Sequence, residues 1–119
     1  MSAKTKRRAY LDKLEARIDQ YRAEMDKLRA KARESHADVR IHIDERLDEL
    51  AERREKLEDR LASAREAGEE AWVEVREGLE EAWLDLQDSL SRAAEEFKQR
   101  SEGAEDDADL YRMEERSRS

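Results

Sequence analysis

The sequence contains one eleven-residue unit written twice, as Glu66-Ala-Gly-Glu-Glu-Ala-Trp-Val-Glu-Val-Arg76 and directly afterwards as Glu77-Gly-Leu-Glu-Glu-Ala-Trp-Leu-Asp-Leu-Gln87. Five positions are identical in the two units, and both tryptophans of the chain, Trp72 and Trp83, occupy the same place in each. Eleven residues complete three helical turns, so every side chain recurs on almost the same helix face. The repeat therefore predicts a helix that presents a fixed apolar stripe to a neighbour.

Apolar residues continue at helical spacing on both sides of the repeat. From Leu11 to Val39 they alternate steps of three and four residues, which is the heptad period of a coiled coil. From Val75 to Phe97 the mean step lengthens to about 3.67, the period of an eleven-residue repeat. We expect helices over about residues 8–62 and 69–99. The residues predicted to pack between helices are Leu47, Leu50, Leu57, Leu61, Trp72, Val75, Leu79, Trp83, Leu86, Leu90 and Phe97.

A turn near residues 63–68 is expected to join the two helices. Ser63 and Glu66 have the spacing of a capping box, and Gly68 is the residue type that most often follows the end of a helix. One break predicts an all-α antiparallel coiled-coil hairpin. Two alternatives stay open. A second break at Ser35 would give a three-helix bundle, and no break would give one continuous helix in an oligomeric coiled coil.

The composition is typical of long helices rather than of a thick globular core. Charged residues make up 49% of the chain and hydrophobic residues 37%, and there is no proline or cysteine. Residues 1–65 hold 18 basic and 15 acidic side chains, whereas residues 66–119 hold 7 and 18, so the two halves can pair within one chain or between chains. We expect a helical domain over 8–100, flanked by a basic disordered N-terminus, 1–7, and an acidic disordered tail, 101–119.

No pattern of catalytic or ligand-binding residues stands out in the sequence. His36 and His42 are six residues apart and lie on different helix faces, which does not match the spacing of a zinc-binding histidine pair. No glycine-rich phosphate loop is present either. We therefore expect a non-enzymatic protein with no catalytic residues, no metal and no cofactor. The start of the chain lacks the apolar run of a secretory signal, which favours a cytoplasmic location.

A second apolar stripe indicates how the chain finds partners. Val73 and Leu84 recur with the repeat, at roughly 150° from the main stripe on a helical wheel. A helix with two stripes usually contacts two neighbours, so we expect a homo-oligomer, most simply a dimer, with another protein partner left open. The alternative is a membrane surface, although the acidic polar face opposes binding to anionic lipid. Nucleic acid bound by the basic N-terminal arm ranks third, because acids are interleaved with its bases.

The repeat also resembles a known group of proteins. Glu69-Glu-Ala-Trp72 and Gly78-Leu-Glu-Glu-Ala-Trp-Leu-Asp-Leu86, together with the preceding heptads, resemble small bacterial coiled-coil proteins described as stress-response or coiled-coil domain-containing. The resemblance covers residues 10–97 and implies an all-helical, non-enzymatic protein, with a stress-related scaffold as one role. No functional residues transfer from it. A weaker likeness to exchangeable apolipoproteins rests on the eleven-residue period alone and lacks their prolines.

Overall fold

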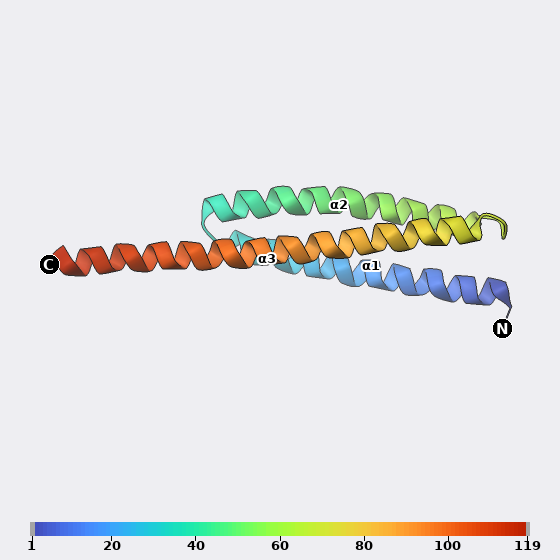
Figure 1. Cartoon of the computed structure of the whole chain (residues 1–119), viewed down its shortest axis with the longest axis horizontal. Coiled ribbons are helices and arrows are strands. Elements are labelled where there is room, and N and C mark those ends of the chain that lie inside the picture. The colour runs from blue at the N-terminus through green and yellow to red at the C-terminus, as the bar shows by residue number, and fades with distance from the viewer. Residues whose placement is uncertain (1, 119) are drawn as a thin grey trace.

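The computed structural model describes the backbone of residues 2–118 and the side chains of residues 2–102. It contains three helices, α1 (Ala3–Arg33), α2 (Ala37–Glu66) and α3 (Trp72–Arg118), and no strand within the described backbone. Figure 1 shows that α2 runs antiparallel to both neighbours, so that α1 and α3 run in the same direction. The predicted all-α class is confirmed, and the topology is an up-down-up bundle.

Both candidate breaks are present, so the single-break hairpin is corrected to its three-helix alternative. The turn expected near 63–68 lies between Glu66 and Trp72. The second break lies between Arg33 and Ala37, inside the helix expected to run unbroken from 8 to 62. There the Ser35 hydroxyl donates a hydrogen bond to the Lys31 carbonyl at 3.3 Å, which satisfies one of the last acceptors of α1. Folding back at this point lets two stretches of the apolar seam bury each other within one chain.

The first helix begins earlier than expected. It starts at Ala3 rather than near residue 8, because the Ser2 side chain accepts a hydrogen bond from the Thr5 backbone N–H at 3.2 Å. A serine in this position satisfies one of the free N–H groups at a helix start. Most of segment 1–7, expected to be disordered, is therefore the first turn of α1. In the expected tail, 101–119, the described backbone continues α3 as far as Arg118, so this helix extends beyond its expected end near residue 99. The side chains from residue 103 onward lie outside the described residues.

The core is a continuous apolar seam shared by the three helices. No charged or polar side chain is buried among the described residues. Each helix supplies seam positions at steps of three and four residues, as the periodicity requires. The buried residues are Leu11, Leu14, Ile18, Tyr21, Met25, Leu28 and Ala32 from α1, Val39, Ile43, Leu47, Leu50, Leu57, Leu61 and Ala64 from α2, and Leu79, Leu86, Leu90 and Ala93 from α3.

The three helix–helix interfaces are not equally close. The backbone of α2 approaches those of α1 and α3 along most of its length, whereas α1 and α3 come near each other at few positions. The bundle is therefore tight around α2 and more open on the face formed by α1 and α3. This open face is where a candidate site must be sought. No helix in the described part of the chain is long and apolar enough to cross a membrane.

Candidate functional site

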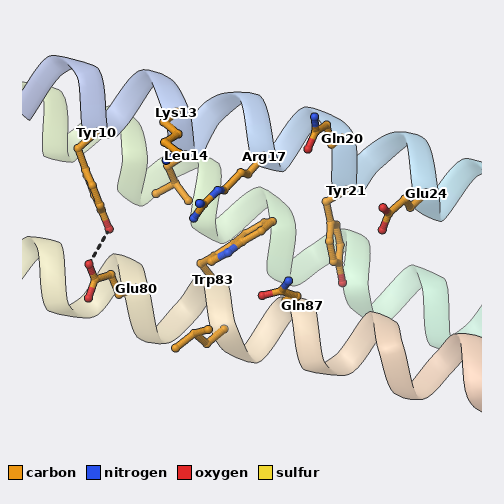
Figure 2. A pocket seen from close by; sticks show the side chains of 11 residues that line it. Tyr10, Lys13, Leu14, Arg17, Gln20, Tyr21, Glu24, Glu80, Trp83 and Gln87 are labelled. Carbon is orange, nitrogen blue, oxygen red and sulfur yellow. Dashed lines mark hydrogen bonds between the residues drawn. The ribbon is translucent and has the colours of Figure 1, made fainter.

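A groove of about 580 Å³ runs between α1 and α3 on the open face of the bundle. In Figure 2, Arg17 and Tyr21 reach into the gap from α1, and Trp83 rises into it from α3. Aromatic and aliphatic side chains form the base of the groove, and charged and amide side chains form its rim. The residues that line this α1–α3 groove are Tyr10, Lys13, Leu14, Arg17, Gln20, Tyr21, Glu24, Glu80, Trp83, Leu84 and Gln87.

Two matching aromatic pairs hold α1 and α3 together below the groove. Tyr10 and Trp72 have ring centroids 5.8 Å apart with planes at 81°, and Tyr21 and Trp83 are 5.9 Å apart at 67°. Both are edge-to-face contacts, which aromatic rings prefer to full stacking. The tyrosines are eleven residues apart and so are the tryptophans. Because α1 and α3 run in the same direction, the equal spacing places both pairs in register.

The two tyrosine hydroxyl groups are used to position the helices. The Tyr21 hydroxyl donates to the carbonyl of Leu86 on α3, and burial of this side chain raises its pKa. The Tyr10 hydroxyl donates to Glu80 Oε1 at 3.3 Å. The pKa of Tyr10 is also raised, first by partial burial and then by the charge of Glu80. Both phenols therefore stay protonated around neutral pH and act as hydrogen-bond donors rather than as acid–base groups.

Arg7 links all three helices at the end of the bundle where the α2–α3 turn lies. Its guanidinium donates hydrogen bonds to the carbonyls of Ala64 and Ala67, at the end of α2. The same guanidinium lies 4.9 Å from the centroid of the Trp72 ring, at the start of α3. A cation is favoured both at a helix C-terminus and over an aromatic face. This part of the basic N-terminal segment is thus an element of the bundle rather than a free arm.

The interfaces of α2 are closed by polar contacts as well as by the core. Arg65 lies 3.0 Å from Asp12 and 2.7 Å from Glu15 on α1. On the other side, His42 Nε2 lies 2.8 Å from Glu96 Oε2 on α3. The hydrogen bond from His42 is the main cause that lowers the pKa of the Glu96 carboxyl. No ion pair links α1 to α3 among the described side chains. The polar and aromatic contacts across that interface are the two tyrosine–tryptophan pairs, the tyrosine hydrogen bonds, and the guanidinium groups of Arg7 over Trp72 and of Arg76 over Tyr10.

Two large apolar side chains remain exposed beside the groove. Val73 is 64% exposed and Leu84 is 61% exposed, and each directly follows one of the groove tryptophans in sequence. They are the two residues of the second stripe expected from the repeat. The described bundle therefore leaves this stripe without a partner. One other large apolar residue is comparably exposed in the described part of the chain, Ile41 at 54%, and it lies on α2 away from the groove.

Of the residues predicted to pack between helices, some are buried in the core and the others lie at its edge. Leu47, Leu50, Leu57, Leu61, Leu79, Leu86 and Leu90 are buried, whereas Trp72, Val75, Trp83 and Phe97 are partly buried against the core. The sequence patterns did not predict the contacts of Arg7 or the role of Tyr10 and Tyr21 in joining α1 to α3. A signal for the tyrosines was available, because Tyr10 and Tyr21 repeat the eleven-residue spacing of Trp72 and Trp83.

Clusters of metal-binding side chains and similarity to known proteins are two further sources of information on function. No group of three or more His, Cys, Asp or Glu side chains within residues 2–102 is placed to hold a metal ion. No family model, curated protein or solved structure matches the chain. The resemblance to small bacterial coiled-coil proteins therefore stays a prediction, and function has to be argued from the groove.

Proposed function

We propose that this chain is a non-enzymatic structural protein that acts by association of helices, with a second copy of itself as the foremost partner. The observation that carries this proposal is the α1–α3 groove with its exposed lining residue Leu84 and the equally exposed Val73 beside it on α3. A groove between two parallel helices accepts a further helix, whose apolar face is read at steps of three and four residues. The bundle can therefore accept a further helix in this groove.

The position of the repeat supports association rather than a purely internal role. Trp72 and Trp83 already contact tyrosines of α1. Internal packing therefore accounts for the tryptophans but not for the apolar residue that follows each of them. Burial of one valine or leucine side chain contributes about 1.5–3 kcal/mol when complete. Burial of Val73 and Leu84 on each chain would therefore contribute to the affinity of a dimer. In a monomer both side chains stay exposed and make no such contribution.

A membrane surface is the second candidate. Val73 and Leu84 lie on one face of α3 beside partly buried tryptophans, as in helices that rest in the lipid interface. The neighbouring charges argue against anionic lipid, because Glu77, Glu80 and Glu81 lie between the two apolar residues. We therefore rank protein association first.

Tryptophan emission separates the two candidates, because both tryptophans of the chain lie at the α1–α3 interface. Emission would be recorded across a range of protein concentrations, alone and with vesicles of phosphatidylcholine or of phosphatidylcholine mixed with phosphatidylglycerol. We expect a blue shift that grows with protein concentration and does not require vesicles. Sedimentation measured in parallel should show the same transition as an increase in mass.

Two matched variants make the test specific. Leu84→Asn should abolish the concentration-dependent shift, because it removes an apolar contact at the groove. Ile41→Asn should preserve the shift, because it removes an equally exposed apolar residue from a different face. A shift that appears only with vesicles would replace the proposal by lipid binding. A chain that stays monomeric and spectrally constant in all conditions would refute both.

A further inference from the structure

We infer that the α1–α3 groove is covered by a second copy of this chain in one particular orientation, with α1 of each copy packed against α3 of the other. The two-fold axis lies parallel to the bundle, so that all four helices at the interface run in the same direction. This inference rests on the proposed function and adds the surface, the pairing and the direction of the helices.

Charge complementarity is the first argument. In the groove, α1 presents Lys13 and Arg17 with one acid, Glu24, whereas α3 presents Glu80. Next to the groove, α3 also presents Glu77 and Arg76, and Arg76 is paired with Glu80 of its own helix. Over longer stretches, residues 1–33 carry 11 basic and 5 acidic side chains, and residues 72–102 carry 4 and 9. Placing α1 of one copy on α3 of the other therefore joins opposite charges twice. Placing α3 on α3 and α1 on α1 joins like charges twice.

The positions of these charges along the bundle axis, called their heights below, agree with packing of α1 of one copy on α3 of the other. The two aromatic contacts put Tyr10 level with Trp72 and Tyr21 level with Trp83. Rotation about an axis parallel to the bundle keeps every residue at its own height. Glu77 and Glu80 of one copy, which lie between the two tryptophans in sequence, therefore meet the stretch of the other copy's α1 between the two tyrosines. That stretch contains Lys13 and Arg17, together with Asp12, Glu15 and Asp19. Asp12 and Glu15 are already paired with Arg65 of α2, on another face of α1.

The apolar residues fit the same arrangement. Leu84 would lie at a height between Gln20 and Glu24 of the other copy, both of which line the groove. Long side chains there can cover an apolar residue with their methylene groups and keep their polar ends outside. Val73 would lie at the height of Tyr10, beside Lys13. Arg17 and Glu77 have no hydrogen bond or ion pair of their own within the described part of the chain. Both are therefore available for contact with the other copy.

The competing arrangement is antiparallel, and it makes different contacts. An axis perpendicular to the bundle would lay α3 against α3, so that Val73 of one copy could meet Leu84 of the other. The same axis would bring Glu77 of one copy against Glu80 of the other. The two arrangements bury the same exposed stripe but predict opposite effects when Glu77 is reversed in charge.

Charge reversal at Arg17 and Glu77 tests the inference. The dissociation constant of the dimer would be measured by sedimentation for Arg17→Glu alone, for Glu77→Arg alone and for the two variants mixed in equal amounts. Each variant alone should weaken the dimer about tenfold, because two opposite-charge contacts become like-charge contacts. The mixture should recover most of the original affinity, since every contact in the mixed dimer again joins opposite charges. The differences should shrink in high salt.

Disulfide formation gives a second readout in a chain that has no cysteine of its own. Chains carrying Gln20→Cys and chains carrying Leu84→Cys, when mixed and oxidised, should form a crosslink between the two variants. Chains carrying Val73→Cys mixed with Leu84→Cys should not. Circular dichroism and thermal melting of each variant would establish that it folds.

The outcomes separate this inference from the proposed function. A dimer that becomes tighter in Glu77→Arg and crosslinks residue 73 to residue 84 would overturn the parallel pairing and leave self-association intact. A chain that stays monomeric at all concentrations would overturn both. Recovery of affinity in the mixture, together with the crosslink between residues 20 and 84, would establish the pairing.

Discussion

The two interfaces of α2 and the interface between α1 and α3 use different chemistry to join helices of the same chain. The helix α2 lies close to both neighbours and fills the narrow space with aliphatic residues such as Ile43 and Leu47, both fully buried. The gap between α1 and α3 is wider, and there two tyrosine–tryptophan pairs span it. Aromatic side chains reach further from the backbone than leucine and can still make specific edge contacts. The close interfaces of α2 stabilise the bundle, and the open interface between α1 and α3 leaves surface available to a partner.

The largest expected effect concerns the aliphatic interfaces. Leu47→Ala should lower the free energy of unfolding by about 2–5 kcal/mol, because it removes a fully buried side chain from α2 and leaves a cavity. Ile41→Ala, on the same helix but largely exposed, should change it by less than about 0.5 kcal/mol. Urea unfolding followed by circular dichroism measures both. Equal losses would mean that α2 is not the packed centre of the bundle.

The two tyrosine–tryptophan pairs should each contribute less than Leu47 to the free energy of unfolding, and the two contributions should be equal. Double-mutant cycles with leucine at Tyr10 and Trp72, and separately at Tyr21 and Trp83, should each give a coupling of about 0.5–1.5 kcal/mol. Equality is expected because the two pairs have nearly the same centroid distance. A cycle across the groove between Tyr10 and Trp83 serves as the control and should give a coupling near zero. Strong coupling in the control would show that the pairs are not the independent units described above.

The Arg7 contact tests how the open interface is held at its end. Arg7→Lys should destabilise the chain by about 1 kcal/mol, because lysine cannot donate to two carbonyls and lie flat on an indole at the same time. Amide hydrogen exchange at the C-terminal turn of α2 should accelerate, since the carbonyls of Ala64 and Ala67 lose their side-chain donor. Arg8→Lys, an exposed neighbour, should change neither measurement. No change in exchange at the end of α2 in Arg7→Lys would contradict the role of Arg7.

The smallest expected effect is a pH dependence at the α2–α3 interface. Because the folded-state pKa of Glu96 is lowered, its contribution to stability is present above the ordinary glutamate pKa of 4.5 and is lost as pH falls below it. The pair is partly exposed, so the loss should stay under about 1 kcal/mol. Glu96→Gln should flatten this part of the stability profile between about pH 5 and pH 3. Glu95→Gln, which changes an exposed neighbour, should retain it.

Much of the fold could be predicted from local pattern, and the exceptions have physical reasons. The apolar seam and the turn before Trp72 follow from spacing and from turn-forming residues. The break at Ser35 was only an alternative, because the alanines around it are compatible with a continuous helix. The early start of α1 was missed, since the capping serine at position 2 precedes a polar stretch with no apolar periodicity. The link between the Tyr and Trp spacings became clear only once α1 and α3 were known to be parallel.

Local sequence pattern is enough to specify that the chain is helical, which face of each helix is apolar, and that one face of α3 repeats its contacts. These properties depend on residues a few positions apart, so a single stretch is sufficient to specify them. Three further properties depend on tertiary contacts: the chain reverses twice, Arg7 caps α2, and the α1–α3 face stays open beside Val73 and Leu84. One seam can be buried in a hairpin, a bundle or an oligomer. The choice among them depends on contacts between segments far apart in the sequence, whose energies local periodicity does not contain.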